Sequence, residues 1–234
     1  LKDGILLMDG QKRNAEGKDG AQQLNAKELR VLSQTRKVPI ASWNALHEGY
    51  EKKSDPCLIK DDDFQGLQSR AEMCQGARVL LTSNLWVKAG LVNGAMGTVR
   101  GFVWPKGGRP GAKDTSKSMP LCVVVEFDEV NLKSPDGEER SFFPGEPEKK
   151  KWVPIFWREA TSSFQEGLVR RQFPLVLAWA ITHWKAQGMT LPRARIRLSA
   201  KIAAEHGVGF VACTRVRHPT HMVFEDDLPD WEAF

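Results

Sequence analysis

The sequence contains no apolar run long enough to cross a membrane as a helix. Its longest apolar run, residues 173–181, is far shorter than the roughly 20 residues that such a helix needs. We also expect no secretory signal, because charges at Lys2, Asp3 and Asp9 interrupt the first residues of this sequence. Since the first residue is Leu1 rather than Met, we expect a fragment or a processed chain. The sequence therefore predicts an intracellular globular protein without a membrane partner.

Cysteine is scarce, and none of it has the spacing of a metal site. No CxxC pair occurs, so the four cysteines are predicted to be reduced thiols that pack inside an intracellular protein: Cys57, Cys74, Cys122 and Cys213. A metal site could recruit Cys213 with His218 and His221. Their spacing matches no zinc pattern and a fourth ligand is missing. We therefore predict no metal site.

The sequence also lacks the GxxxxGK[ST] loop with which motor ATPases hold the phosphates of ATP. Asp128 and Glu129 follow the apolar segment LCVVVEF and so imitate the acidic pair that holds magnesium in such motors. They lie among β-like runs of an expected insertion, and we interpret them as a loop. The chain alone is therefore predicted to have no ATPase activity.

Basic residues gather in the C-terminal third of the chain. The segment 165–219 has nine basic and two acidic residues, a net charge of +7, whereas the whole chain carries +5. Such a concentration suits a polyanion, for example a phosphate backbone or a nucleotide. A solvated basic face balanced by the acidic residues after position 224 explains the charge equally well. The basic residues are Arg170, Arg171, Lys185, Arg193, Arg195, Arg197, Lys201, Arg215 and Arg217.

The order of the apolar runs predicts an α/β domain interrupted by a β-rich insertion. The Gly- and charge-rich residues 1–20 are expected to form a loop, and residues 25–47 a short helix followed by a strand. Strand-like runs then alternate with loops rich in Gly, Pro and Lys, which is typical of a small β-barrel or sheet. These runs occupy residues 77–82, 97–104, 121–127 and 152–157.

After Arg171 the pattern returns to that of an α/β sheet. Residues 173–181 form a continuous apolar run, as expected of a parallel strand that is covered on both faces. A strand at 194–199, a helix at 208–216 and a strand at 221–225 are predicted to follow. Because ligands of such sheets bind at the carboxyl ends of the strands, the polar residues after 181 are candidates for a site.

Residues 178–191, AWAITHWKAQGMTL, present several polar groups directly after an apolar strand. Thr182 can cap the next turn with its hydroxyl, and His183 and Lys185 supply donors where backbone amides also point outward. Gln187 and Gly188 add an amide and a position that a backbone can approach closely. This chemistry suits phosphate binding, but it also fits an ordinary loop with a helix cap.

The same segment resembles the fifth motif of the Pif- and RecD-like superfamily 1 DNA helicases, A-x-A-I-T-I-H-K-S-Q-G-x-T-L. In that family the motif reaches the backbone of single-stranded DNA and borders the nucleotide cleft. The family's Ile-His pair is His183-Trp184 here, so the imidazole would turn to the opposite side of a strand-like backbone. Trp184 would then stack on a base or pack in the core. By position, the resemblance implies DNA contacts from Thr182, His183, Trp184 and Lys185, and places Gln187 and Gly188 near the nucleotide.

Two further segments resemble the same family. Residues 209–218, GFVACTRVRH, contain V-A-C-T-R-V-R, which is similar to the sixth motif, V-A-L-S-R-V-R. The resemblance implies that Arg215 is the finger that contacts the γ-phosphate of ATP, where it would stabilise developing charge. Without the resemblance, a surface position or a structural ion pair is the commoner role for a single arginine. Residues 76–99, GARVLLTSNLWVKAGLVNGAMGTV, resemble the family stretch that leads into a small barrel.

The resemblance implies a fold and a domain division. The fold is α/β: a second RecA-like (P-loop NTPase-type) helicase domain over residues 1–98 and 166–234, interrupted by a small Src-homology-type β-barrel insert over 99–165. The chain would be the C-terminal part of an ATP-dependent DNA helicase that translocates on single strands in the 5′ to 3′ sense. ATP and Mg²⁺ would be held mainly by the N-terminal RecA-like domain of the same protein.

The resemblance also implies partners and a setting. These are single-stranded or forked DNA, a monomeric state, a nuclear or mitochondrial location in a eukaryote, and roles in DNA repair, recombination and telomere maintenance. Two alternatives remain open from the sequence. One is a non-catalytic nucleic-acid-binding module, and the other is an inactive helicase fragment of a mobile element.

Overall fold

A computed structural model of the chain describes residues 5–8, 20–49, 59–109, 118–133, 140–198 and 207–225. The backbone forms two compact units. Unit 1 comprises residues 1–31 and 177–234, and unit 2 comprises residues 32–176. Within the described ranges, no helix is long and apolar enough to span a membrane.

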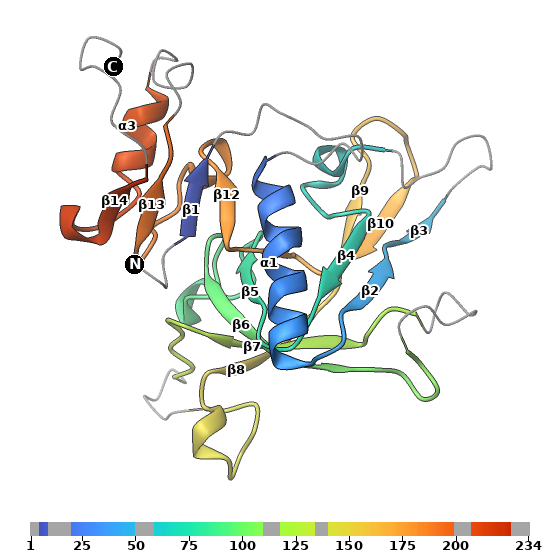
Figure 1. Ribbon diagram of the computed structural model, residues 1–234. Coiled ribbons are helices and arrows are strands. Elements are labelled where there is room, and N and C mark those ends of the chain that lie inside the picture. Colours follow the sequence, from blue (N-terminus) through green and yellow to red (C-terminus); the bar gives the residue numbers. More distant parts are fainter. Residues whose placement is uncertain are drawn as a thin grey trace. The chain divides into compact units, whose positions relative to one another are not determined.

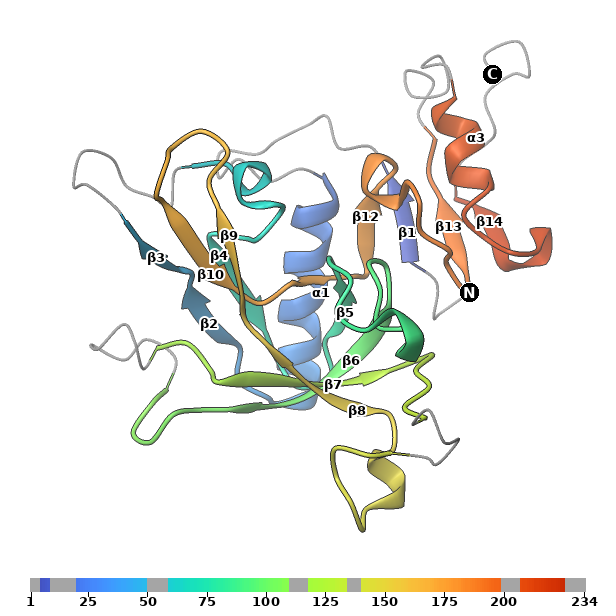
Figure 2. The ribbon, with the colours of Figure 1, turned by 180° about the vertical axis from the view of Figure 1, so that it is seen from behind.

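Unit 1 contains a four-stranded parallel sheet (Figures 1 and 2). Its strand order is β12-β1-β13-β14, and all three neighbouring pairs are parallel. The carboxyl ends of the four strands therefore meet at one edge of the sheet. The strands are β1 (Ile5–Met8), β12 (Ala180–Thr182), β13 (Ala194–Ile196) and β14 (Met222–Phe224), and the short helices of the unit are η6 (Trp184–Ala186), α3 (Val208–Cys213) and η7 (Pro219–His221).

Strand β1 lies in the middle of this sheet, where the sequence predicts a loop, and that prediction is wrong at these four residues. Ile5, Leu6 and Leu7 are each at most 1% exposed. A central strand of a parallel sheet needs apolar side chains on both faces, so a short run with no alternation is sufficient. Glycine and charged residues flank this short run, and they led to the prediction of a loop.

Helix α1 (Gly20–Arg36) packs on the sheet through one face and belongs to unit 1 as far as Val31. Ala21, Asn25 and Leu29, which recur every four residues, are its buried residues. Ala21 packs with Leu6 of β1 and Ala180 of β12. The predicted helix followed by a strand is thus confirmed, with β2 (Ala41–Asn44) as the strand.

The buried amide of Asn25 fixes the backbone that leads into β12. Its Nδ2 donates to the carbonyls of Leu177 and Ala180 at 3.1 and 2.7 Å. Its Oδ1 accepts from the amides of Trp179 and Ala180 at 3.0 and 2.8 Å. These bonds take the place of strand pairing. The single strand predicted over residues 173–181 is therefore wrong: β11 (Leu175–Leu177) joins a sheet of unit 2, and β12 begins three residues later.

Replacing Asn25 with alanine is expected to lower the free energy of unfolding of unit 1 by about 2–3 kcal/mol, because buried backbone groups lose their partners. Chemical denaturation followed by circular dichroism would measure the loss. Lys27→Ala, an exposed change on the same helix, is the matched control and should have little effect. Equal stability of the two variants would contradict the role given to the amide.

The described residues of unit 2 form three sheets. The largest has the order β11-β5-β6-β7-β8, and its pairs from β5 to β8 are antiparallel. Figure 2 shows β6, β7 and β8 side by side. The other sheets have the orders β3-β10-β9 and β2-β4. The remaining bounds are β3 (Leu46–Glu48), η2 (Asp61–Phe64), β4 (Arg70–Met73), β5 (Arg78–Leu81), η3 (Val87–Ala89), β6 (Met96–Val103), β7 (Cys122–Phe127), η5 (Pro147–Lys149), β8 (Trp152–Phe156), β9 (Arg158–Thr161) and β10 (Val169–Gln172).

The strands predicted at 77–82, 97–104, 121–127 and 152–157 are confirmed as β5, β6, β7 and β8. The compact unit is wider than the predicted insertion over 99–165, because strands outside that segment pair with strands that cross its boundary or lie inside it. Strand β5 pairs with β6, and β10 pairs with β9. The insertion boundaries themselves stay a prediction.

A fully buried arginine, Arg170, holds several segments of unit 2 together. Its guanidinium lies over the ring of Phe64, with 4.0 Å from Cζ to the ring centroid. Its three nitrogens donate to a ring nitrogen, a carboxylate and two carbonyls. The acceptors are His47 Nε2 at 2.9 Å, Asp61 Oδ1 at 2.9 Å, Leu67 O at 2.8 Å and Ile59 O at 3.1 Å.

Candidate functional site

The residues after β12 form a short polar loop at the carboxyl edge of the unit 1 sheet. Thr182 ends the strand and is 6% exposed, and its Oγ1 accepts from the amide of Lys185 at 3.4 Å, a long capping contact. The single turn η6 follows. Lys185, Gln187 and Gly188 are all exposed, and Gly188 has a positive φ of 74°. The loop therefore presents a cation and an amide to solvent above a buried hydroxyl.

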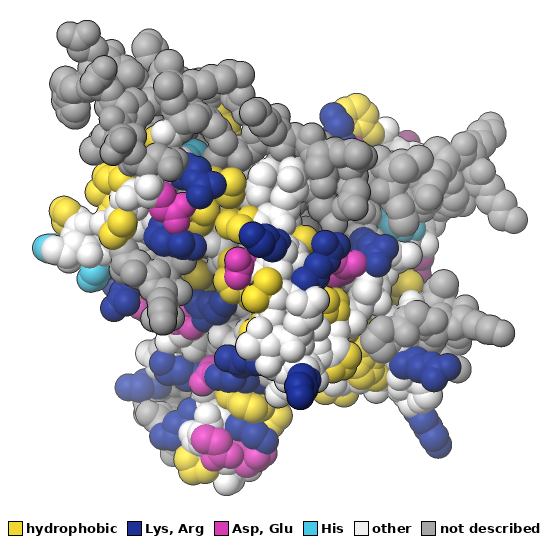
Figure 3. Space-filling view, viewed as in Figure 1, with side chains coloured by type: hydrophobic (Ala, Val, Ile, Leu, Met, Phe, Trp, Pro, Cys, Tyr) yellow, Lys and Arg dark blue, Asp and Glu magenta, His cyan; other side chains and the backbone are white. Residues whose placement is uncertain are grey.

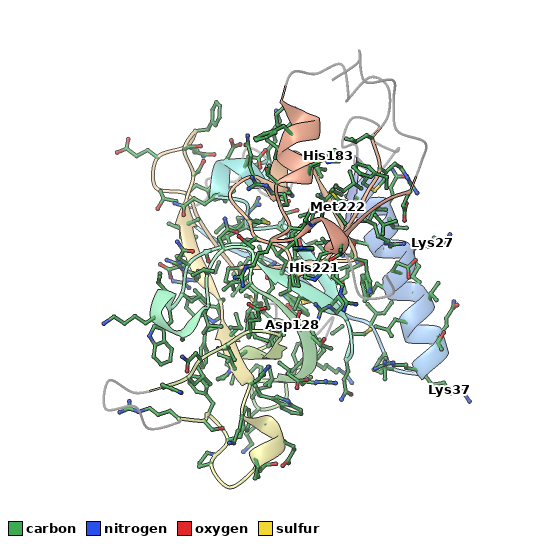
Figure 4. All side chains as sticks on the ribbon, turned by 90° about the vertical axis from the view of Figure 1, so that its left-hand side faces the viewer. Lys27, Lys37, Asp128, His183, His221 and Met222 are labelled. Carbon is green, nitrogen blue, oxygen red and sulfur yellow. The ribbon has the colours of Figure 1, made fainter. Side chains whose placement is uncertain are left out.

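His183 points into the protein, although the sequence groups it with the DNA contacts. It is 1% exposed, and its Nε2 lies 3.0 Å from the carbonyl oxygen of Arg197, which follows β13. Its amide donates to the carbonyl of Met8 at 3.3 Å, so His183 joins the ends of three strands. Figure 4 marks its position. The imidazole thus supports the loop from below, whereas the neighbouring Trp184 is 53% exposed.

Arg215 lies two residues after the end of α3 and turns its guanidinium back toward the same loop. Its Nε donates to the carbonyl of Val211 at 2.8 Å, and its Nη1 to the carbonyl of Met189 at 3.3 Å. Its Nη2 donates to Thr214 Oγ1 at 2.8 Å. The backbone closes the contact, because the amide of Leu191 donates to the carbonyl of Arg215 at 2.7 Å. The structure thus brings the two sequence motifs together within unit 1.

Much of the basic charge noted in the sequence is neutralised within the chain. Arg170 and Arg171 are paired inside unit 2, the latter with Glu48 and Glu159. Arg195 and Arg197 share the carboxylate of Glu225 at 2.9 and 2.8 Å. Lys201 lies outside the described residues. Among the described members of the group, those exposed to solvent and without an ion pair are Lys185, Arg193 and Arg217.

The sequence is similar to DNA helicases over most of its length. It is 31% identical to the ATP-dependent DNA helicase PIF1 of Danio rerio over 217 residues, which are 92% of this chain and 27% of that protein. It is 34% identical to the ATP-dependent DNA helicase PIF1 of Homo sapiens over 173 residues, which are 74% of this chain and 22% of that protein. The chain is a Pif1-type helicase region. No model of a protein family matches it.

Solved structures of Pif1 helicases share the mixed α/β fold of this Pif1-type region. The match to Pif1 of Candida albicans has a TM-score of 0.59 at 21% identity, and covers 94% of this chain and 44% of that one. The match to unliganded Pif1 of Bacteroides sp has a TM-score of 0.58 at 18% identity, and covers 99% of this chain and 42% of that one. The predicted α/β class is thus confirmed. The region spans 27% of the length of the Danio rerio relative, so most of that relative has no counterpart in it.

The ion pairs of Glu225 in this Pif1-type region were not predicted from the sequence. Figure 3 shows basic and acidic side chains together over β13 and β14. The pairing follows from strand order, since β14 lies beside β13 and Glu225 directly follows β14. A sequence reading finds the two strands but gives no signal that they are neighbours.

Other predicted features of the Pif1-type region have structural roles. Asp128, which was interpreted as part of a loop, forms an ion pair with Arg78, with 2.5 Å between Oδ2 and Nη2. Burial raises the pKa of the free thiols of Cys74, Cys122 and Cys213, and Cys57 lies outside the described residues. Within the described ranges, no group of three His, Cys, Asp or Glu side chains could hold a metal ion. The absence of a metal site in the whole chain stays a prediction.

Proposed function

We propose that the chain is the C-terminal part of an ATP-dependent DNA helicase, and that it supplies part of the DNA track and an arginine finger. One observation carries the proposal. The loop expected to meet DNA and the arginine expected to meet ATP are joined in one unit, through Met189 and Leu191. The relatives named above are ATP-dependent DNA helicases, which supports the same assignment.

The proposed DNA track is the exposed surface of the loop after β12. Trp184, half exposed, offers a ring on which a base can stack, and Lys185 offers a cation to a neighbouring phosphate. Thr182 and His183 act beneath them, through the hydroxyl cap and the bond to the Arg197 carbonyl. We therefore assign direct contact to the exposed pair and support to the buried pair.

Arg215 is proposed to complete an ATP site that the N-terminal RecA-like domain of the same protein holds, together with Mg²⁺. Gln187 and Gly188 would border that nucleotide. This sequence contains no GxxxxGK[ST] phosphate-binding loop, which supports the assignment of ATP binding to the other domain. A structure of Bacteroides sp Pif1 with ADP-AlF4 matches the chain with a TM-score of 0.57. Opening and closing of the two domains would move the strand past Trp184 and Lys185.

Finer features of the proposal follow the family. Translocation would run 5′ to 3′, and the protein would act as a monomer in the nucleus or mitochondrion of a eukaryote. The consecutive antiparallel strands β6, β7 and β8 support a Src-homology-type barrel over residues 99–165. Forked DNA is a proposed substrate, since a Pif1 structure described with DNA unwinding at forked dsDNA matches the chain with a TM-score of 0.52.

Replacing Trp184 with alanine is expected to weaken binding of oligo(dT) to the chain by about 1–3 kcal/mol through loss of stacking. Lys185→Ala should weaken binding and lower the slope of log affinity against log salt by about 0.7, the value for one phosphate contact on a single strand. Fluorescence anisotropy at several salt concentrations measures both effects.

Lys27→Ala removes the same charge from helix α1, which Figure 4 shows away from His183, and serves as the matched control. A salt slope that Lys27→Ala lowers as much as Lys185→Ala does would mean that binding depends on net charge alone. That result would contradict the proposed track.

A further inference from the structure

Strand β13 has one buried face and one basic face that is open to solvent. Ala194 and Ile196 are each 0% exposed, whereas Arg193 and Arg197 are exposed and Arg195 is partly exposed. Pairing with β1 continues past both ends of the strand, through the carbonyl of Arg193 at 3.3 Å and the amide of Arg197 at 2.9 Å. Because alternate residues of an extended strand point the same way, the three arginines share one face at intervals of about 6.6 Å.

An open basic face is unusual at this place in the sheet. Strand β13 pairs in parallel with β1 on one side and β14 on the other, and such internal strands are normally covered on both faces. Arg195 is in register with Leu6 of β1 and lies on the same face. Helix α1 covers that face over β1 and β12, where Ala21 packs with Leu6 and Ala180. Over β14 the same face presents Val223, 44% exposed. This half of the sheet face is therefore accessible to a partner.

A single carboxylate on this face meets three guanidiniums. Glu225, directly after β14, pairs with Arg195 at 2.9 Å and with Arg197 at 2.8 Å, and Figure 3 shows basic and acidic side chains together there. Arg193 has no ion pair within the described ranges. The buried Nε of Arg195 also has no acceptor among the residues that the structure describes. Positive charge and an unsatisfied donor thus remain, and both call for a further anion.

The row of arginines suits a phosphate backbone better than a single small anion. Guanidinium groups bind phosphate through pairs of N–H groups, and here they recur at a fixed spacing, as phosphates do along a strand. The row also adjoins the loop after β12, because His183 Nε2 lies 3.0 Å from the carbonyl oxygen of Arg197. Trp184 and Lys185, the proposed DNA contacts, directly follow His183. A strand bound at the loop can therefore continue onto the face of β13.

We propose that Arg193, Arg195 and Arg197 form an arginine row that binds the phosphate backbone of single-stranded DNA and extends the track from the loop after β12. The identity of this ligand rests on the proposed function. Glu225 is a built-in competitor, because a phosphate must take its place at Arg195 and Arg197. The carboxylate keeps these two side chains paired in the free chain and lowers the affinity of the row for DNA.

Removal of the competing carboxylate is the first test. Glu225→Gln should strengthen binding of oligo(dT) to the chain about fivefold at low salt, because phosphate no longer displaces an ion pair. The gain should vanish when Arg195 and Arg197 are both alanine. Glu72→Gln is the matched control, since Glu72 pairs with the exposed Arg70 at 2.9 Å on β4 of unit 2 and its loss changes the net charge equally. Fluorescence anisotropy measures the affinities, and circular dichroism confirms that each variant is folded.

Removal of one arginine is the second test. Arg197→Ala keeps the main-chain carbonyl that meets His183 and should lower the slope of log affinity against log salt by about 0.7, the value for one phosphate contact on a single strand. Arg70→Ala, which removes the same charge from unit 2, should leave the slope nearly unchanged.

The outcomes separate the arginine row from the proposed function. Equal gains for Glu225→Gln and Glu72→Gln, or a gain that persists without the arginines, would overturn the row. Tighter binding of hexaglutamate than of an oligo(dT) with the same number of charges would assign the surface to an acidic protein segment and overturn its assignment to DNA. If Lys185→Ala weakens binding but Glu225→Gln has no effect, the row alone fails. If oligo(dT) does not bind the chain, the proposed function fails and the row fails with it.

Discussion

Replacement of Arg215 with alanine in the complete helicase is expected to lower kcat for ATP hydrolysis about 1,000-fold or more, while affinity for single strands stays within about twofold. A finger acts on charge that develops in the transition state, so its loss affects turnover far more than binding. The guanidinium of Arg215 donates to the Met189 carbonyl, whereas the proposed DNA contact is the exposed ring of Trp184. Loss of the Arg215 side chain should therefore leave DNA binding largely intact. Steady-state ATPase assays with saturating oligo(dT), paired with anisotropy, separate the two effects.

Two neighbouring substitutions sharpen this test. Arg217→Ala removes an exposed arginine two residues further along the chain and should leave turnover nearly unchanged. Arg215→Lys keeps the charge but loses the planar fork, and should recover only a small part of the rate. Turnover of Arg215→Ala equal to that of Arg217→Ala would instead favour a non-catalytic nucleic-acid-binding module or an inactive fragment.

Replacement of Arg170 with methionine is expected to lower the free energy of unfolding of unit 2 by about 3–5 kcal/mol, because breaking a buried ion pair leaves its partners unsatisfied. Arg170 is fully buried and supplies hydrogens to His47, Asp61 and two carbonyls. Methionine can fill the space but donates no hydrogen bond. Urea denaturation followed by tryptophan fluorescence would measure the change.

Arg171→Met is the matched control for this prediction. Arg171 is adjacent in sequence and also contacts two carboxylates, those of Glu48 and Glu159, but its side chain is partly exposed to solvent. Surface ion pairs contribute little to stability, so little change is expected. If the two variants unfolded at the same urea concentration, the buried hydrogen bonds of Arg170 would contribute no more to the free energy of unfolding than the surface ion pairs of Arg171.

Sequence patterns predicted elements whose apolar runs are long and bounded by turn residues. Strands β6, β7 and β8 are of this kind. Patterns failed where tertiary contacts decide the outcome. Strand β1 is short, and it is a strand because it lies between β12 and β13. The run 173–181 is apolar throughout, but four hydrogen bonds with the side chain of Asn25 divide it: two that Asn25 donates and two that it accepts.

In the candidate site and among the basic residues, too, distant contacts determine features that the local sequence does not predict. The shift of the histidine relative to the family motif predicted that the imidazole of His183 turns to the opposite side of a strand-like backbone. In the structure His183 has helical backbone angles, and its imidazole is buried against the Arg197 carbonyl. The adjacent positions Arg170 and Arg171 look alike in sequence. One is buried and the other is on the surface, because adjacent residues of strand β10 point to opposite faces. Both have partners more than a hundred residues earlier, Asp61 for Arg170 and Glu48 for Arg171. No local pattern reports such distant partners.

Photo-crosslinking tests the central claim most directly. Oligo(dT) carrying 5-iodouracil would be irradiated with the chain at low salt, and the attached peptide would be identified by mass spectrometry. The account predicts that the crosslink lies within residues 180–193 and is centred on Trp184, and that Trp184→Ala removes most of it. Crosslinks confined to unit 2, or unaffected by Trp184→Ala, would contradict the assignment of this loop as the DNA track.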